Sequence, residues 1–339
     1  MNVFELTRAL VDIESITLNE EAVGNFLYGY LAPLAARFGG RVERVEAEPR
    51  RCNIFAQWGQ PLVVTLSTHM DTVPPFFASS ESETHIRGRG ACDAKGIAAA
   101  MIAAAEGLLE AGERGFGLLF VVGEERNSAG AYRAARDGRG SRYLVDGEPT
   151  GNKLALGSKG ALRYEVAATG RMAHSAYPEL GDSAIHKLVD SLAAIRRIPL
   201  PADPVLGAST LNIGTLSGGR APNVVADEAH ADVMVRLVGD SAEIKSALAS
   251  AVAGRAELRE VIEIPALRLN AIPGIETTVV AFTTDIPAFG GAWGEPFLIG
   301  PGCIHVAHTP DECVSKAQLV EAVSIYRRMV RHLCKNASK

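Results

Sequence analysis

The sequence predicts an α/β protein that carries a second, smaller domain as an insertion. Three observations predict this fold class. Short apolar runs, typical of buried strands, alternate with helical periodicity through residues 41–145, an order that builds a mostly parallel sheet covered by helices. From residue 158 to residue 263 the order becomes strand, helix, two strands, helix and strand, as in a ferredoxin-like α+β unit. Strands and a helix of the first kind return from residue 277. We therefore expect one domain of residues 1–157 and 264–339, and an inserted domain of residues 158–263.

Helical periodicity opens the first domain. Asn19 is the expected cap of its second helix, because its side chain can accept a backbone N–H and acidic Glu20 and Glu21 follow in the first turn. Helices are expected at residues 2–12, 19–37, 97–111 and 129–136, and strands at residues 41–46, 53–58, 62–66, 117–123 and 142–145.

The inserted domain begins with a clear strand pattern. Residues 162–167 alternate apolar and polar side chains, which predicts a strand with one buried face. The remaining expected elements are helices at 183–195 and 241–253 and strands at 209–215, 229–237 and 261–264. Back in the first domain, we expect strands at 279–282 and 297–300 and an amphipathic helix from 315 to about 333.

Composition excludes several classes of partner. A chain of 339 residues with 47% hydrophobic side chains can form two moderate cores. The net charge of −5 and the pI near 6.0 argue against nucleic acid or an anionic membrane as the main partner. The N-terminus lacks the basic and apolar regions of a signal peptide, and no apolar run approaches 18 residues. We expect a cytoplasmic protein that binds a small molecule.

The five cysteines point the same way. They are odd in number, scattered along the chain and without CxxC spacing, which indicates neither a disulfide framework nor a thiolate zinc site. A reducing compartment is the expected environment.

Histidines and acids follow the predicted strands of the first domain. His69 and Asp71 come just after the strand at 62–66, and their two-residue spacing aims both side chains the same way. Asp93 lies in a glycine-rich turn before the alanine-rich helix. Imidazole nitrogen and carboxylate oxygen suit a divalent ion such as zinc, although a single His-x-Asp pair is common by chance.

Further candidates occupy later strand ends. The adjacent Glu124 and Glu125 point in different directions, so that one can bind a metal and the other can take a proton from its water. Glu148 lies in a tight Gly-Glu-Pro turn, and His308 lies on a loop before the last helix. Each residue alone is ordinarily solvated or part of a turn; their joint position at strand ends favours a metal site.

Six motifs, in order, carry a family resemblance: STHMDTVP, GRGACDAKG, VVGEE, DGEPT, GRMAHSAYPELG and GPGCIHVAHTPDECV. They resemble the co-catalytic zinc amidohydrolases, the family of acetylornithine deacetylase, succinyl-diaminopimelate desuccinylase, carboxypeptidase G and the aminoacylases. The resemblance covers nearly the whole chain. It implies a zinc-peptidase-like catalytic domain, an inserted lid or dimerisation domain, a homodimer formed through that domain, and two Zn²⁺ ions for which Co²⁺ can substitute.

The resemblance also implies a ligand for each metal. His69 would bind the first zinc and Glu148 would complete its site. Glu125 and His308 would bind the second zinc, and Asp93 would bridge both.

Catalytic and substrate-binding roles follow by the same resemblance. Asp71 would orient the ring of His69, and Glu124 would serve as general base and acid. The peptide bond between Asp93 and Ala94 would be cis. His174 would stabilise the tetrahedral oxyanion, often across a dimer interface; without the resemblance it could be a polar loop residue.

Two residues of the inserted domain resemble those that bind the substrate carboxylate. They are Asn223 and Arg236, and arginine is suited to bidentate recognition of a carboxylate. Arg236 could instead simply end a strand.

Two points of the sequence limit the assignment. Desuccinylases carry an arginine where this chain has Ile286 and Pro287, which argues against a succinyl-diaminopimelate substrate. His305 could compete with His308 as a ligand, but the spacing of His308 to Glu312 matches the family.

The sequence therefore predicts an enzyme that hydrolyses the amide bond of an N-acyl amino acid, with acetylornithine deacetylase as the favoured type. The alternatives are a peptidase, acting as a carboxypeptidase, a dipeptidase or a hydrolase that frees an amino acid from a carrier protein, and a non-catalytic binding protein.

Overall fold

The computed structural model describes residues 1–337 and divides the chain into two compact units. Unit 1 comprises residues 1–156, 269–278 and 284–339, and unit 2 comprises residues 157–268 and 279–283. The predicted border before residue 158 lies next to this division, whereas the second border is more complex, because residues 279–283 also belong to unit 2.

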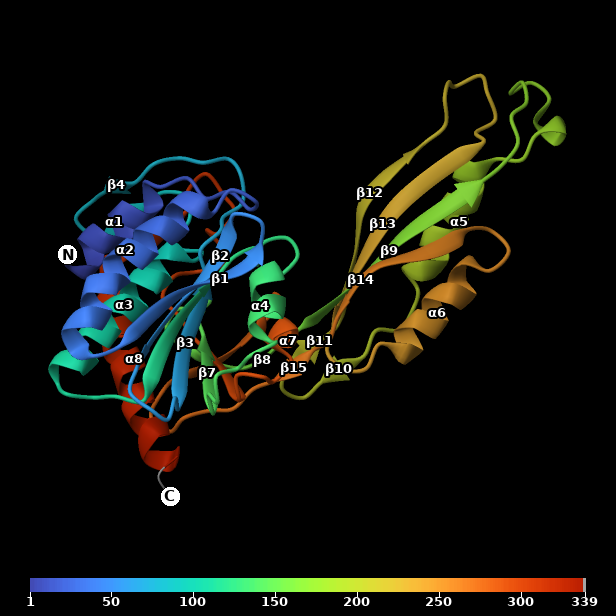
Figure 1. Cartoon of the computed structure of the whole chain (residues 1–339). Coiled ribbons are helices and arrows are strands. Elements are labelled where there is room, and N and C mark those ends of the chain that lie inside the picture. Colours follow the sequence, from blue (N-terminus) through green and yellow to red (C-terminus); the bar gives the residue numbers. More distant parts are fainter. Residues whose placement is uncertain (338–339) are drawn as a thin grey trace. The chain divides into compact units, whose positions relative to one another are not determined.

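A six-stranded mixed sheet forms the centre of unit 1 (Figure 1). In spatial order the strands are β1 (Arg41–Glu48), β2 (Arg51–Trp58), β6 (Phe116–Val121), β3 (Val64–His69), β7 (Tyr143–Asp146) and β17 (Glu295–Leu298). The last four strands of this order run parallel to one another, whereas β1 and β2 run antiparallel to their neighbours.

Helices cover both faces of this sheet. The main apolar core lies on one face, where strand residues such as Leu66 and Leu118 pack against four helices. These helices are α1 (Val3–Val11), α2 (Glu21–Phe38), α3 (Lys95–Glu110) and α8 (Lys316–Ala337). A smaller core on the other face packs Phe55 and Leu119 against the short helices α4 (Ala129–Ala134) and α7 (Ile286–Phe289). Alternating side chains of each strand therefore feed two separate cores.

Smaller sheets accompany these elements. One contains β15 (Leu267–Arg268), β8 (Leu154–Ser158) and β16 (Thr277–Val280), and another contains β18 (Cys313–Ser315), β5 (His85–Arg87) and β4 (Ser80–Glu81). A two-stranded hairpin pairs β10 (Ala202–Asp203) with β11 (Gly207–Ala208), and a single 3₁₀ turn, η1, spans Pro178–Leu180.

Unit 2 is a four-stranded antiparallel sheet with two helices on one face. Its sheet order is β12 (Thr210–Gly218), β13 (Glu228–Leu237), β9 (Gly160–Thr169) and β14 (Glu257–Ile264). Helices α5 (Ala184–Ile195) and α6 (Ala242–Val252) pack Leu188 and Leu248 onto the buried side chains of β9 and β13. The chain order and the strand order are those of a ferredoxin-like unit, which confirms the predicted fold class.

The predicted cap of α2 is wrong. The helix begins at Glu21, and Glu20, not Asn19, occupies the cap position without a side-chain capping bond. The Glu20 carboxylate instead forms a buried ion pair with Arg51 on β2, so a tertiary contact fixes the start of this helix.

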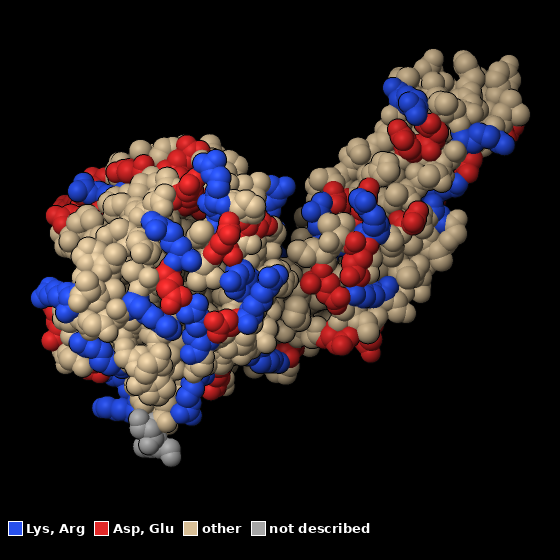
Figure 2. All heavy atoms as spheres, viewed as in Figure 1, with Lys and Arg blue, Asp and Glu red and all other residues tan. Residues whose placement is uncertain are grey.

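Charge is dispersed over the surface. Figure 2 shows lysine and arginine side chains interspersed with aspartate and glutamate on the visible face, in keeping with 34 basic and 39 acidic residues. Among residues 1–337, no helix combines the length and apolar character needed to cross a lipid bilayer.

Candidate metal centre

The parallel strands of unit 1 bring four candidate residues to one edge of the sheet. His69 is the last residue of β3, Glu124 and Glu125 follow β6, and Glu148 follows β7. Because β6, β3 and β7 are parallel neighbours, their carboxyl ends meet at the same edge, where functional groups of α/β proteins commonly gather.

Two loops complete the site. Asp93 lies in the turn that leads into α3, and its peptide bond to Ala94 is cis, as expected. The turn requires a glycine at position 90, where φ is +87° and an added Cβ would lie 2.9 Å from the side chains of Lys95 and Thr72. His308 comes from the loop between β17 and β18 and adopts a left-handed backbone conformation with φ of 61°.

Asp93 lies between the two histidines. Its Oδ1 is 2.9 Å from His69 Nε2, and its Oδ2 is 3.4 Å from His308 Nε2. The same nitrogen of His308 is 3.0 Å from Glu125 Oε1. Each oxygen of one carboxylate thus faces a different histidine, which is the arrangement a bridging ligand requires.

The ligand atoms fall into overlapping groups whose members lie within 4.8 Å of one another. His69, Asp93 and Glu148 form one group, and Asp93, Glu125 and His308 form a second. These are the two ligand sets expected from the sequence, with Asp93 common to both. A third group contains His69, Glu124 and Glu125.

The donor set fits divalent cations. Four carboxylates and two imidazoles share a small volume, and within residues 1–337 no lysine or arginine forms an ion pair with these carboxylates. Uncompensated buried carboxylates are costly, and nitrogen with oxygen donors suits zinc and similar ions. The residues present therefore fit a pair of such ions.

The pKa values of the acids reflect the same excess of negative charge. Burial raises the pKa of Glu148 well above its usual value, and the nearby carboxylates of Glu124 and Asp93 raise it further. Burial also raises the pKa of Glu124 well above its usual value, with a further increase from Asp285 and Glu125. Without a cation, protons would compensate the charge.

The histidines respond in the opposite sense. Hydrogen bonds from His308 to Asp93 and Glu125 raise the pKa of His308 to about 10. Burial alone would lower the pKa of His69, but hydrogen bonds with Asp71 and Asp93 raise it well above its usual value. These contacts thus favour the protonated form of both rings in the metal-free protein.

Asp71 contacts both His69 and the glutamate turn. His69 Nδ1 lies 3.0 Å from the backbone carbonyl oxygen of Asp71 and 3.5 Å from its Oδ1. The Asp71 carboxylate also accepts the backbone N–H groups of Gly123, at 3.0 Å, Glu124, at 3.1 Å, and Glu125, at 3.2 Å. One side chain therefore connects the end of β3 to the turn after β6.

The two glutamates differ in their contacts. Glu125 is bonded to His308, whereas the side chain of Glu124 makes no hydrogen bond or ion pair within the described part of the chain. Glu124 nevertheless belongs to the group with His69 and Glu125. This leaves Glu124 next to the candidate ligands with its carboxylate free.

The structure separates the two competing histidines. His305 is exposed and belongs to none of the ligand groups found among residues 1–337. At the position of the desuccinylase arginine, Ile286 is buried and Pro287 lies in the first turn of α7. No cationic side chain is therefore present at that position.

The residues expected to contact substrate lie in unit 2. His174 and Asn223 lie close together: His174 forms a β-bridge with Val224, and the N–H of Ser175 donates to the carbonyl of Asn223 at 3.0 Å. His174 Nδ1 accepts the N–H of Ala176 at 3.1 Å, which leaves the proton of a neutral ring on Nε2. The loops that carry them extend from the same end of the sheet (Figure 1).

Arg236 does not join them. It lies near the end of β13 opposite to the end that leads from the Asn223 loop, and the strand from Ala229 to Arg236 spans about 24 Å. Arg236 is half-buried, forms no ion pair within residues 1–337, and burial lowers its pKa. Asn223 and Arg236 of one chain therefore lie toward opposite ends of β13, and their expected roles in binding the substrate carboxylate stay predictions.

Sequence reasoning missed several residues around the site. Asp146 and Asp285 are buried next to the cluster: burial raises the pKa of Asp285 to about 7 and that of Asp146 well above its usual value. Asp146 was visible in the DGEPT motif but had no assigned role. Arg89 and Glu312 form a buried ion pair beneath the Asp93 turn; the only signal in the sequence was the spacing of Glu312 to His308.

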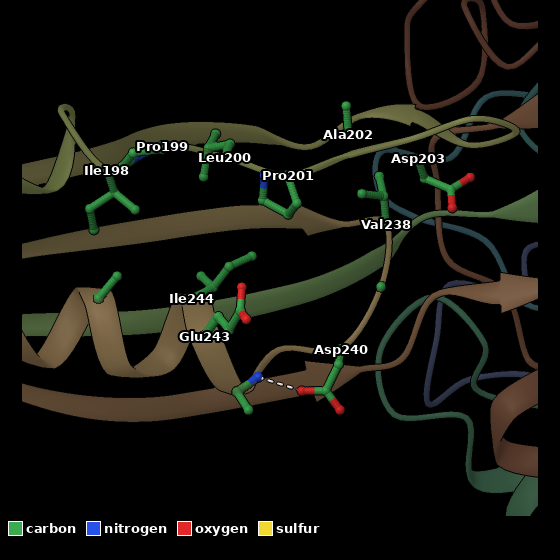
Figure 3. A pocket seen from close by; sticks show the side chains of 13 residues that line it. Ile198, Pro199, Leu200, Pro201, Ala202, Asp203, Val238, Asp240, Glu243 and Ile244 are labelled. Atoms are coloured by element: carbon green, nitrogen blue, oxygen red, sulfur yellow. Dashed lines mark hydrogen bonds between the residues drawn. The ribbon is translucent and has the colours of Figure 1, made fainter.

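A separate hollow of about 860 Å³ lies within unit 2 (Figure 3). Apolar side chains such as Leu200 and Val238 line it together with Asp203 and Asp240. Asp203 pairs with Arg268, and Asp240 accepts the N–H of Ala242 at the start of α6. Two of the acids that line it, Asp203 and Asp240, thus already have partners, and none of the candidate ligands lines it.

Comparison with known proteins places this site in a wider group. A model of peptidase family M20/M25/M40 matches residues 65–332. A Peptidase M20 domain-containing protein of Schizosaccharomyces pombe is 38% identical over 98% of this chain and 84% of its own length. A probable carboxypeptidase of Aspergillus terreus is 35% identical over 95% of this chain and 84% of its own length. The crystal structure of aminopeptidase PepT from Bacillus cereus superposes with a TM-score of 0.80 at 19% identity, covering 98% of both chains.

Proposed function

The chain belongs to peptidase family M20/M25/M40, and from this premise we propose that it is a metal-dependent carboxypeptidase that hydrolyses the amide bond of an N-acylated amino acid and so releases the free amino acid. Relatives of similar length are named peptidases and probable carboxypeptidases. The expected reaction, hydrolysis of the amide bond of an N-acyl amino acid, is of the same kind when the acyl group is a peptide or a carrier protein.

One observation supports this proposal above all others. The two oxygens of Asp93 face His69 and His308, which come from separate segments of unit 1. A pair of divalent ions held there, Zn²⁺ in our proposal with Co²⁺ as a substitute, would polarise the scissile carbonyl and lower the pKa of water. Asp93 and Glu148 with His69 would hold one ion, and Asp93 and Glu125 with His308 the other.

Glu124 is the proposed general base. Its carboxylate has no hydrogen-bond partner within the described residues and lies beside His69 and Glu125. It would accept a proton from the attacking water and transfer that proton to the leaving nitrogen, so that the carboxylate is regenerated when the amide bond breaks. Asp71 would hold Glu124 in place through the backbone.

His174, Asn223 and Arg236 are proposed to bind the substrate. His174 is exposed and free to donate from Nε2, which suits stabilisation of an oxyanion. Arg236 offers a half-buried guanidinium without a counter-ion among residues 1–337, which suits a carboxylate.

The separation within unit 2 supports a homodimer. An amino acid cannot contact residues about 24 Å apart at once. We therefore propose that His174 and Asn223 of one copy and Arg236 of another serve the same site. Sedimentation equilibrium of the full chain should give a dimer, and a monomer of full activity would contradict this arrangement.

Acetylornithine deacetylase is the second candidate. The motifs shared with that enzyme, from STHMDTVP to GPGCIHVAHTPDECV, favour it. A succinyl-diaminopimelate substrate is disfavoured, because Ile286, which is buried, and Pro287 offer no positive charge to a second carboxylate.

Product analysis distinguishes the candidates. The zinc-loaded chain is incubated with dipeptides, longer peptides, and N-acetyl amino acids including N-acetylornithine. A carboxypeptidase releases the last amino acid from the peptides, whereas a deacetylase releases acetate from N-acetylornithine. Release of no amino acid from any substrate by protein that holds both ions would overturn the proposal.

A further inference from the structure

Arg89 and Glu312 form an ion pair that is almost completely buried, with 1% of each residue exposed. The guanidinium also donates from Nε to the carbonyl of Pro75 at 3.2 Å and lies over the ring of Phe77, 5.0 Å from its centroid. The arginine of the pair is thus held by the segment that precedes the Asp93 turn.

The Glu312 carboxylate organises the backbone of that turn. Its Oε1 accepts the N–H groups of Gly90, at 2.8 Å, Cys92, at 3.2 Å, and Asp93, at 3.1 Å. The carbonyl of Glu312 accepts the N–H of Gly88 at 3.1 Å. Three converging N–H groups form an anion-binding concavity, and without Glu312 they would be buried donors without partners.

The pair connects segments that carry metal ligands. Asp93 lies four residues after Arg89, and Glu312 lies four residues after His308. Asp93 and His308 are the members of the second ligand group that lie on loops. Each loop therefore also carries one partner of this ion pair. His69 is the last residue of β3 and Glu148 follows β7, and within the described residues neither forms a hydrogen bond or ion pair with Arg89 or Glu312.

A purely structural role explains this arrangement poorly. A buried ion pair contributes little net stability compared with apolar side chains of similar volume, because removing two charges from water is costly. Its value lies in fixed geometry: a planar guanidinium and three N–H groups allow one orientation of the carboxylate.

We propose that Arg89 and Glu312 are positioning residues that hold Asp93 and His308 at the spacing the second cation requires. This inference rests on the proposed function, since it concerns the same pair of ions. Loss of the pair should affect the Asp93–Glu125–His308 group more than the His69–Asp93–Glu148 group, because only the former depends on it through two ligands.

Cobalt alone serves as the probe. Metal-free wild-type protein and Glu312→Gln are titrated with Co²⁺, and both the visible absorption and the affinity of each step, measured against a competing chelator, are recorded. Because contacts of this kind typically change metal affinity by about 10- to 100-fold, the second step should weaken by about that factor and its spectrum should change. The first step should change several-fold less.

A matched control separates positioning from stability. Leu31→Ala removes a fully buried side chain from α2 and destabilises the core without contacting a ligand segment. It should leave both cobalt steps and both spectra unchanged. At saturating metal, Glu312→Gln should lower kcat with KM within about threefold, because the substrate contacts are intact.

Arg89 provides an independent variant in case Glu312→Gln does not fold. Arg89→Lys keeps a positive charge opposite Glu312 and should retain most of the second cobalt step, whereas Arg89→Met should lose it. Wild-type second-step affinity and spectrum in any folded variant that lacks the ion pair would overturn the inference, as would a wild-type protein that binds one cobalt. Wild-type protein that binds two cobalt ions but cleaves no substrate would overturn the proposed function alone.

Discussion

The backbone N–H of Glu124 donates a hydrogen bond of 3.1 Å to the carboxylate of Asp71. Asp71 Oδ1 also accepts from Gly123, while Oδ2 accepts from Glu125 and from the hydroxyl of Thr17. Burial would raise the pKa of Asp71, but the hydrogen bond and charge of His69, together with the donors of Thr17 and Glu125, hold it below its usual value. The orientation of the proposed base therefore depends on a residue that also contacts His69.

Asp71→Asn tests this dependence. An amide offers one accepting oxygen, so the N–H of Glu124 or that of Glu125 would face another donor. We expect kcat to fall by about 10- to 100-fold, measured as initial rate at saturating zinc. Thr17→Val removes only the hydroxyl contact at Oδ2 and should change kcat by less than about threefold. Equal losses in both variants would contradict the importance of the backbone contacts.

Adjacent Glu124 and Glu125 should respond differently to the same substitution. Glu124→Gln should keep both ions, because Glu124 makes no bond to His308, and should lose about 10²-fold or more in kcat through loss of acid–base catalysis. Glu125→Gln should lose the second ion, since Glu125 lies 3.0 Å from His308. Metal content by elemental analysis and initial rates check both. Glu110→Gln, at an exposed position on α3, is the control. The reverse pattern of metal loss would exchange the two roles.

The candidate ligands could be predicted from the sequence because each has a recognisable place relative to a strand or a loop. Every expected ligand follows a strand or lies in a glycine-rich or proline-rich loop, and those positions can be predicted because parallel strands end at one edge of a sheet. Helix and strand periodicity likewise predicted both units.

Contacts between distant segments could not be predicted. Arg89 and Glu312 are separated by 223 positions, and a charged residue in a glycine-rich loop ordinarily lies in water. The separation of Asn223 and Arg236 could not be predicted for a related reason: strand length, and not motif order, determines how far apart the two residues lie. The predicted cap of α2 was wrong because an ion pair between Glu20 and Arg51, and not a local capping bond, stabilises the start of the helix.

Metal uptake should release protons. In the metal-free protein, Asp93 and Glu125 raise the pKa of His308 from 6.5 to about 10, and a metal requires the neutral ring. Near pH 7 the ring must therefore lose a proton when the second ion binds, so the apparent affinity should rise with pH by up to about tenfold per unit. Calorimetry in buffers of different ionisation enthalpy measures the released protons. His305→Gln should leave this number unchanged, whereas His308→Gln should reduce it.

The same shift predicts how the metal-free protein responds to alkali. The folded-state pKa of His308 is raised, so its contribution to stability is fully present below about pH 6.5 and is lost as pH rises through about 10. The free energy of unfolding of wild type should approach that of His308→Gln over this window. Denaturant titration at pH 6, 8 and 10 measures the difference; a gap that widens with pH would contradict the assignment.

Asp285 predicts a loss of stability with rising pH in a lower pH range than His308. Burial raises the pKa of this acid from 3.8 to about 7, in part offset by the hydroxyl of Ser128. A carboxyl whose pKa is raised on folding binds its proton more tightly in the folded state, so its ionisation destabilises the fold as pH rises from about 4 to about 7. Asp285→Asn should therefore raise the free energy of unfolding of the metal-free protein, by a margin larger at pH 8 than at pH 5. Asp137→Asn, an exposed acid, should give no such difference. Bound cations would offset the charge of Asp285, so the gain should shrink in the zinc-loaded protein. A gain that is the same at both pH values would mean that folding does not raise the pKa of Asp285.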